Sequence, residues 1–312
     1  MIQPAVVALG GGHGLAASLA ALRHLTDRIT AIVTVADDGG SSGRLRREYE
    51  VLPPGDLRMA LAALCGQTEW GQLWAQVLQH RFGGNGPLAG HALGNLLIVG
   101  LWELLGEPVS ALDVVGRLLG ARGRVLPMAA VPLEIHADVL GLDPDRPGVV
   151  DEVRGQVQVA TTSGEVLSVR LEPADPPAPE ETVQAVLAAD WVILGPGSWF
   201  TSEMPHLLVP RLRDALLVTP AQRLLTLNLQ LNTKETQGFS AAHHVEALAA
   251  HAPEMTLDVV LADPRVVGDD DRLRAAAERM GARLVIAPVA ALDAPATHDP
   301  LRLAAAYRDI LG

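Results

Sequence analysis

The sequence contains a single cysteine, Cys65, and a single lysine, Lys234. One cysteine excludes an intrachain disulfide framework and a cysteine-based zinc site. With one lysine, phosphate contacts must come mainly from arginine, histidine, hydroxyl groups or backbone N–H groups. No Gly-Lys-Ser or Gly-Lys-Thr run occurs, so ATP chemistry of the Walker type is not expected.

Aromatic residues are also scarce, at 3%, whereas apolar residues make up 49% of the chain. The core must therefore consist of Ala, Val, Leu and Ile, which suits a buried parallel sheet covered by helices. Acidic residues outnumber basic ones by 36 to 24, which gives a formal charge of -12. Such a surface repels duplex nucleic acid, and we expect no nucleic-acid partner.

Long hydrophobic runs are missing as well. The longest candidate, Leu93–Leu105, is too short for a membrane span and contains Glu103. Met1–Gly10 lacks the charged start of a signal peptide. We therefore expect no membrane insertion and a cytoplasmic location.

The chain opens with the order strand, glycine loop, helix, strand. The apolar runs Ala5–Leu9 and Ile29–Val35 predict strands, and Leu15–Leu25 between them has helical spacing. This order is typical of a doubly wound sheet. The alternation of strands and helices resumes at the predicted strand Trp191–Leu194 and ends with a helix that Asp299 caps. The other predicted elements are helices at Leu57–Cys65, Glu69–His80, Leu93–Leu105, Ala241–His251 and Asp270–Met280, and strands at Leu224–Leu229, Leu257–Ala262 and Arg283–Pro288.

The middle of the chain has a different pattern. Asp151–Glu172 alternates apolar and polar residues around Ser163-Gly164, which predicts a β-hairpin. A proline-rich connector, Pro173–Pro179, follows it. We predict a Rossmann-like, doubly wound, mainly parallel α/β fold. It forms one domain over residues 1–312, with a small antiparallel hairpin insertion at about 151–172.

Three loops rich in glycine and hydroxyl groups follow predicted strands, where an open α/β sheet binds its ligand. Glycines allow the backbone to approach a ligand, and a helix N-terminus offers free N–H groups to an anion. In the second loop, the acids could bind a ribose or Mg²⁺, the serines could donate to phosphate, and the arginine could add a charge-assisted contact. The candidate residues are Gly10, Gly11, Gly12, His13 and Gly14; Asp37, Asp38, Gly39, Gly40, Ser41, Ser42 and Arg46; and Gly195, Gly197, Ser198, Thr201 and Ser202, with Asn228 after a further strand.

Other polar residues lie near helix starts. Asp56 is a plausible N-cap or a ligand-binding acid, and Arg58 follows it. His91 and Asn95 border the apolar helix Leu93–Leu105, which we expect to be buried, and they could form a pocket wall. The pair His243-His244 is expected at the surface. His-Glu-x-x-His is absent, and we assign no catalytic residue and no metal site.

The loops together resemble the YvcK proteins, which are called gluconeogenesis factors and are related to the CofD 2-phospho-L-lactate transferases. The run Val35–Leu45 carries most of this resemblance. The further matching segments are Gly10–Leu15, Pro53–Arg58, Gly90–Leu97, Arg122–Pro127, Gly195–Ser202 and Pro205–Val209, and the likeness spans about residues 4–310. The resemblance implies a protein that binds a UDP-sugar such as UDP-N-acetylglucosamine. It also implies effects on cell-wall synthesis, cell shape and growth on gluconeogenic carbon sources.

The sequence departs from that family at a few positions. His13 stands where many relatives have Thr, and Met59 replaces a common Asn. In the segment Asn232–Thr236, only Glu235 and Thr236 match the usual pattern. No firm cofactor follows, although Mg²⁺ is a candidate companion of a diphosphate ligand. Cell-wall synthesis proteins are candidate partners, and homo-oligomerisation stays open.

Three functions remain in competition at this point. The first is a non-catalytic UDP-sugar-binding regulator, because no nucleophile is found. The second is a Mg²⁺-dependent transferase of the 2-phospholactate type, which acts on a nucleotide-activated substrate with Asp37, Asp38 and Asp56 at its metal-bound diphosphate. The third is an NAD(P)-dependent oxidoreductase, which the absence of the third fingerprint glycine disfavours.

Overall fold

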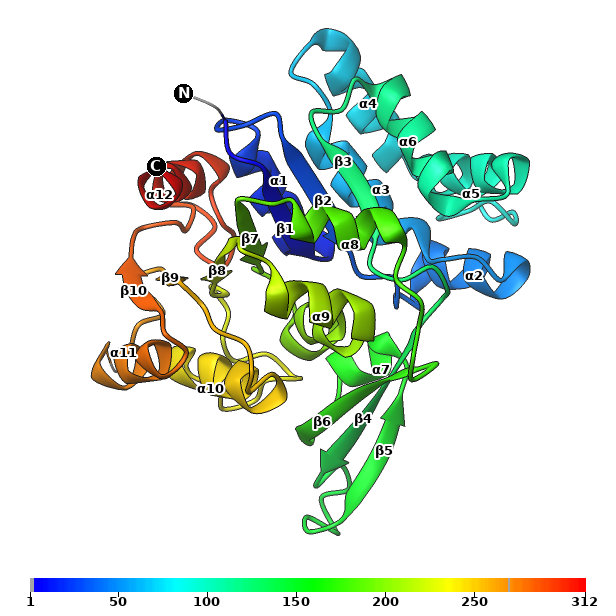
Figure 1. Cartoon of the computed structure of the whole chain (residues 1–312). Helices are drawn as coiled ribbons and strands as arrows, with labels where there is room; N and C mark the ends of the chain where they lie inside the picture. Colours follow the sequence, from blue (N-terminus) through cyan, green and yellow to red (C-terminus); the bar gives the residue numbers. More distant parts are fainter. Residues whose placement is uncertain (1–2, 269) are drawn as a thin grey trace.

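The computed structural model describes residues 3–268 and 270–312 of the chain (Figure 1). Within these residues, seven strands form one sheet in the order β10-β9-β8-β7-β1-β2-β3, and every neighbouring pair is parallel. Their bounds are β1 Val6–Gly10, β2 Ile29–Val33, β3 Arg124–Pro127, β7 Trp191–Leu194, β8 Gln222–Thr226, β9 Val259–Ala262 and β10 Arg283–Ile286. The predicted doubly wound, mainly parallel α/β fold is confirmed.

The direction of winding reverses in the middle of this sheet. From β1 the chain proceeds outward through β2 to β3, whereas from β7 it proceeds through β8 and β9 to β10 at the other edge. β1 and β7 are neighbours, paired from Val6–Trp191 to Leu9–Leu194. The loops after these two strands diverge, and a crevice opens at their carboxyl ends, where open α/β sheets bind ligands.

Helices cover the sheet and supply most of the core. In Figure 1, α8 and α9 lie together in front of the strands, whereas α1 packs with α3 and α12. β1 is buried along its whole length because both of its faces are covered. The helix bounds are α1 Gly12–Leu22, α2 Gly40–Tyr49, α3 Pro54–Leu64, α4 Glu69–Gln79, α5 Leu93–Leu105, α6 Pro108–Leu119, α7 Gln156–Ala160, α8 Glu180–Leu187, α9 Pro210–Val218, α10 Ala241–His251, α11 Asp270–Arg279 and α12 Pro300–Leu311.

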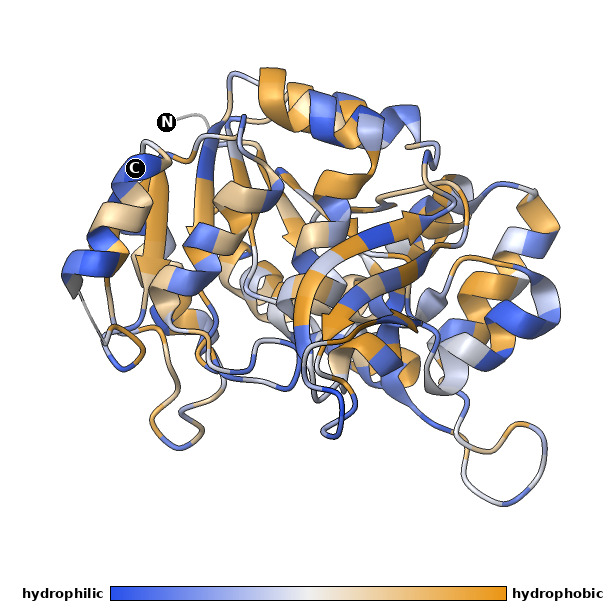
Figure 2. Ribbon diagram, turned by 90° about the horizontal axis from the view of Figure 1, so that it is seen from below, coloured by the Kyte–Doolittle hydropathy of each residue, from blue (hydrophilic) through white to orange (hydrophobic). Residues whose placement is uncertain are grey.

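A small antiparallel sheet replaces the predicted hairpin. The central strand β4, Glu134–Leu140, pairs with β5, Val150–Arg154, on one side and with β6, Glu165–Glu172, on the other. The prediction of a β-hairpin with a turn at Ser163-Gly164 is therefore wrong: β5 and β6 do not pair, and α7 lies between them in the chain. Apolar and polar segments alternate along this sheet (Figure 2), because one face packs on the core.

Two further expectations need correction. The segment from Gly40 onward is not a flexible loop but the first turn of α2. α5 is only partly buried: Ile98 and Val99 pack inward, but Leu104 near its end is 77% exposed. None of the described helices is both long and apolar enough to cross a membrane.

The pair His243-His244 is not at the surface as a whole. His244 is fully buried, with its ring 5.1 Å from that of Trp199. Its Nδ1 hydrogen-bonds the carbonyl of Ser240, one helical turn earlier. The side chain lies on the inward face of α10, which the adjacent position His243 does not share.

Candidate functional site

The three predicted loops meet at the carboxyl edge of the sheet. They line a cavity of about 340 Å³ between β1, β2 and β7. Gly12 and His13 lie on one side, Asp37 on another, and Ser198 and Ser202 close it from the β7 loop. The sequence-based expectation that these segments converge is confirmed, whereas ligand binding there stays a prediction.

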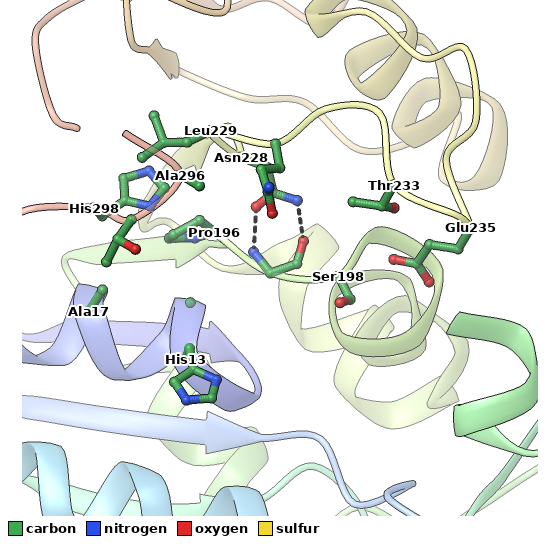
Figure 3. Close-up of a pocket in the computed structure, with 14 residues that line it drawn as sticks. His13, Ala17, Pro196, Ser198, Asn228, Leu229, Thr233, Glu235, Ala296 and His298 are labelled. Atoms are coloured by element: carbon green, nitrogen blue, oxygen red, sulfur yellow. Dashed lines mark hydrogen bonds between the residues drawn. The ribbon is translucent and has the colours of Figure 1, made fainter. Parts of the chain in front are cut away.

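A second cavity, of about 220 Å³, continues this hollow toward β8. His13, Gly14, Gly197 and Ser198 line both cavities, so the two form one groove. Figure 3 shows His13 at the start of α1 on one side of the second cavity and His298 on the opposite side. We call these two joined cavities the main groove.

Asn228 holds the loop that divides the main groove. Its Oδ1 accepts from the N–H of Gly197 at 2.9 Å, and its Nδ2 donates to the carbonyl of the same residue at 2.5 Å (Figure 3). This paired contact fixes the backbone of the β7 loop. Asn228 was predicted to join the site, and in the structure its side chain supports the backbone of Gly197.

Glycines in these loops allow neighbouring segments of the chain to pack closely, in addition to leaving space for a ligand. A Cβ at Gly14 would lie 1.9 Å from the carbonyl oxygen of Pro196, so α1 and the β7 loop can approach only because residue 14 is glycine. A Cβ at Gly11 would lie 2.5 Å from Asp56 Oδ2. The space above Gly11 is thus taken by a carboxyl group of the chain itself.

The carboxyl groups of Asp56 and Glu235 line the main groove, and that of Glu203 lies beneath its glycine loops. Burial, reinforced by the charge of Asp37, raises the pKa of Asp56 to about 7. Burial likewise raises the pKa of Glu235 to about 7, although Thr201 donates a hydrogen bond to it at 3.2 Å. Burial and the neighbouring Glu235 raise the pKa of Glu203 to about 8. These acids are therefore largely protonated below neutral pH.

Glu203 was not predicted from the sequence. It belongs to a π-helical turn, Trp199–Glu203, that continues into the 3₁₀ segment Met204–Leu208. Its side chain lies beneath the glycine loops, since a Cβ at Gly197 would be 1.9 Å from Glu203 Oε1. The N–H of Gly195 opposes its pKa shift, yet among the described residues neither carboxyl oxygen has a partner with hydrogen-bond geometry. The sequence signal that could have identified Glu203 is that it is a lone acid in a run of apolar and hydroxyl residues.

His298 is a second lining residue that the sequence did not single out. It precedes Asp299, whose carboxylate caps α12 as predicted by accepting from the N–H groups of Leu301 and Arg302. Burial lowers the pKa of His298 to about 4, so the ring is neutral at physiological pH. Its Nε2 is buried and has no partner among the described residues. The ring lines the main groove, but this nitrogen itself is enclosed by the protein.

Comparison with known proteins identifies the family. The family model described as 2-phospho-L-lactate transferase CofD matches residues 6–305. The chain belongs to the CofD family.

Relatives of this CofD-family chain carry a consistent name. A protein of Mycobacterium tuberculosis (strain ATCC 25618 / H37Rv), named "Putative gluconeogenesis factor", is 56% identical over 96% of this chain and 88% of its own length. The "Gluconeogenesis factor" of Bacillus subtilis (strain 168) is 37% identical over 86% of this chain and 81% of its own. A crystal structure from Bacillus halodurans, described as a UPF0052 family member, has a TM-score of 0.87 at 31% identity and covers 98% of this chain and 99% of that one. The resemblance and the fold class are confirmed.

Several predicted residues of the CofD-family chain do not reach the main groove. Asp38 accepts from the N–H of Val157 at 3.1 Å and so contacts α7. Arg46 donates to the carbonyl of Leu133 at 2.7 Å. The predicted residues that line none of the described cavities are Gly10, Asp38, Arg46, His91 and Gly195.

Asp56 does not have the predicted N-cap position. Pro53 caps α3, and Asp56 is the third residue of the helix. Its carboxyl group instead faces the N–H of Gly12 at the start of α1. Part of the anion-binding N-terminus of α1 is therefore occupied by an acid of the chain itself.

The remaining predicted residues line a third cavity, of about 250 Å³, which we call the side hollow. It adjoins the main groove because Asp37, Asp56 and Met59 line both. The predicted residues found there are Gly39, Gly40, Ser41, Ser42, Arg58 and Asn95. The predicted site is thus brought together as a main groove and an adjoining hollow.

The acids at this junction fit a hard cation only in combination with a ligand. Asp37 and Asp56 offer carboxylate oxygens, which Mg²⁺ prefers, and Mg²⁺ commonly takes one or two carboxylates together with substrate phosphates. No group of three or more His, Cys, Asp or Glu side chains in the described part of the chain could hold a metal by itself. These two residues would therefore hold Mg²⁺ when a phosphate supplies further oxygens.

Proposed function

We propose that the chain binds a nucleoside-diphosphate sugar, specifically a UDP-sugar such as UDP-N-acetylglucosamine, in the main groove. The observation that carries the proposal is the groove itself. It lies at the switch point between β1 and β7, and the glycine loops that follow these two strands line it. The choice of uridine and of the sugar comes from the resemblance to the YvcK proteins.

The shape of the groove suits a ligand with two bulky ends and a narrow middle. The two cavities join at Gly14, Gly197 and Ser198. In our proposal a diphosphate occupies this junction, and the nucleoside and the sugar each take one cavity. Cavities of this size at the switch point are usual sites for nucleotide-type ligands.

The charges near the junction set a condition on binding. With a single lysine in the chain, the donors that the groove offers to phosphate include backbone N–H groups, His13 and the hydroxyl groups of Ser198 and Ser202. Asp56 lies close by and would repel a diphosphate when ionised. Protonation of Asp56, or Mg²⁺ held between Asp37, Asp56 and the diphosphate, removes that repulsion.

A non-catalytic role accords with these features. The relatives' printed names connect the family with gluconeogenesis, and we propose that this chain influences growth on gluconeogenic carbon sources. A cytoplasmic protein that senses a cell-wall precursor would act on cell-wall synthesis and cell shape through partner proteins.

Calorimetric titration of UDP-N-acetylglucosamine, with and without Mg²⁺, tests the proposal. Ser198 is exposed at the junction, so Ser198→Trp should fold normally and block the groove. Ser163→Trp is the matched control, because Ser163 is exposed and lines none of the described cavities. Binding to the wild type and the control, but not to Ser198→Trp, is the expected result. No heat with the wild type at millimolar ligand would reject the proposal, and ADP-glucose and NADPH test the choice of nucleotide.

A Mg²⁺-dependent transferase of the 2-phospholactate type is the second candidate. The position of Asp37 and Asp56 at the cavity junction and the printed name of the family model favour it. In that reading, the two acids hold Mg²⁺ at a nucleotide-activated substrate, and the Gly12–Gly14 segment orients its phosphates. Incubation with a nucleotide-activated lactate and a deazaflavin acceptor decides between the two, since an acceptor of unchanged mass leaves only the binding role.

A further inference from the structure

The side hollow contains a buried positive charge that no carboxylate of the described residues neutralises at close range. Arg58, on α3, is only 4% exposed and lines this hollow. Its Nε is buried without a hydrogen-bond partner. Among the described residues, no carboxylate oxygen lies within 4.0 Å of its guanidinium group. Buried charges in proteins are normally paired, so this arrangement indicates a missing anion.

The surrounding packing directs Arg58 into the hollow. A Cβ at Gly94 of α5 would lie 2.9 Å from Cγ of Arg58 and 2.8 Å from the carbonyl oxygen of Leu78. Only glycine at position 94 therefore leaves a channel for the aliphatic part of the arginine between α3 and α5. The chain thus makes room for a buried cation that has no close carboxylate partner.

A second arginine lies beside the first. Arg81 lines the same hollow and is anchored through a hydrogen bond from Nη1 to the carbonyl of Gly90 at 2.9 Å. Burial and the charge of Arg81 both lower the pKa of Arg58, which shows that the two cations repel each other. Asp37 and Asp56 at the junction with the main groove compensate this charge in part.

Backbone and side-chain groups complete the lining. The N-terminus of α2 opens into the hollow at Gly40–Ser42, and its N-cap, Gly39, provides no side-chain hydrogen bond to the free N–H groups. Such an N-terminus attracts an anion. Asn95 donates to Ser41 Oγ at 3.0 Å, whereas its Oδ1 is buried and unpartnered among the described residues. Besides the carboxyl groups of Asp37 and Asp56, the lining therefore offers many donors and one unpartnered amide oxygen.

We propose that the side hollow binds a small phosphate group, either free phosphate or the phosphate of a small monoester, as a second ligand beside the main groove. Arg58, Arg81 and the N–H groups of α2 receive its oxygens. Asn95 Oδ1 accepts the proton that a hydrogen phosphate still carries near neutral pH. A cavity of about 250 Å³ accommodates this group but not a second nucleotide. The assignment stands independently of the ligand proposed for the main groove.

Titration of inorganic phosphate into the full-length protein at constant ionic strength tests this site. Arg58→Gln and Arg81→Gln should each weaken phosphate binding at least tenfold. Arg117→Gln, which removes an exposed positive charge on α6, is the control and should bind like the wild type. Arg81 is itself exposed, so its variant keeps the test meaningful if Arg58→Gln fails to fold. A parallel titration with glycerol 3-phosphate shows whether the site prefers a monoester to the free ion. Loss of the binding heat for phosphate or for glycerol 3-phosphate in both Arg58→Gln and Arg81→Gln supports the site.

Competition with UDP-N-acetylglucosamine separates this proposal from the first. A distinct subsite predicts that phosphate-saturated protein still binds the UDP-sugar, and that Arg58→Gln binds it too. Phosphate that does not bind at 10-millimolar levels, binds equally to both arginine variants, or is displaced mole for mole by the UDP-sugar would overturn the inference. If the UDP-sugar does not bind at all, the effect of the two arginine substitutions on phosphate binding still tests whether the side hollow is a phosphate site.

Discussion

Replacement of Glu203 by glutamine should stabilise the protein, and more strongly as the pH rises. The carboxyl group is fully buried beneath Gly10 and Gly197, and neither oxygen has a hydrogen-bond partner among the described residues. Its ionised form is therefore disfavoured in the folded state. Glutamine preserves the shape of the side chain and cannot ionise.

The expected magnitude follows from the pKa values of the two states. Glu203 has a pKa of about 8 when folded and an ordinary value of 4.5 when unfolded. Below pH 4.5 both states are protonated, and the group does not affect stability. Between pH 4.5 and 8 the unfolded state releases its proton but the folded state does not, so the free energy of unfolding falls as pH rises. From pH 5.5 to pH 8 this loss is on the order of 3 kcal/mol.

Thermal unfolding from pH 5.5 to pH 8 measures the effect. For a chain of 312 residues, 3 kcal/mol corresponds to a change in Tm of about 5 °C. The difference in Tm between Glu203→Gln and the wild type should grow by this amount across the pH range. Glu254→Gln, at an exposed position, should show no such growth. A difference that stays constant with pH would refute the argument, because it would mean that Glu203 is ionised in the folded protein throughout.

Three further outcomes follow from the same contacts. Without Mg²⁺, the affinity for UDP-N-acetylglucosamine should fall as pH rises through 7, because Asp56 then ionises. In calorimetric titrations, the affinity of Asp56→Asn should not change with pH. If the affinities of the variant and the wild type fall equally with pH, Asp56 is excluded as the cause. Gly14→Ala should lower the free energy of unfolding by about 2 kcal/mol or more, since its Cβ would meet the carbonyl of Pro196 at 1.9 Å, and an unchanged denaturant midpoint would contradict this contact. Asp38→Ala should cost about 1 kcal/mol through the lost bond to the N–H of Val157, yet leave UDP-sugar affinity unchanged; a marked loss of affinity would instead place Asp38 at the ligand.

Much of the fold could be predicted because its signals are local. Short apolar runs predicted β1, β2 and β7, and those of β1 and β7 end in glycine. The predicted Trp191–Leu194 and Ala241–His251 match the structure at both ends. The loops after those strands converge because parallel strands place their carboxyl ends at one edge. That geometry is general, so the sequence alone was sufficient to place His13, Asp37 and Ser198 around one hollow.

The errors arose where a long-range partner decides the structure. β5 and β6 alternate as a hairpin would, but each pairs with β4, a strand that the sequence reading did not identify. The serines after Asp38 were taken for a flexible loop, although they begin α2. A local pattern cannot show which strand fills the space between two others.

The sequence by itself determined the class of the fold and the chemistry of the loops, because hydrophobic periodicity and glycine placement act over a few neighbouring residues. Tertiary structure alone decided how far each polar group is buried. Glu203, Arg58 and His298 look ordinary in the sequence, and only the packing of distant segments around them removes water from their polar atoms. Burial depends on contacts across the whole chain, and it is burial that shifts their pKa values and leaves some of their polar atoms without partners among the described residues.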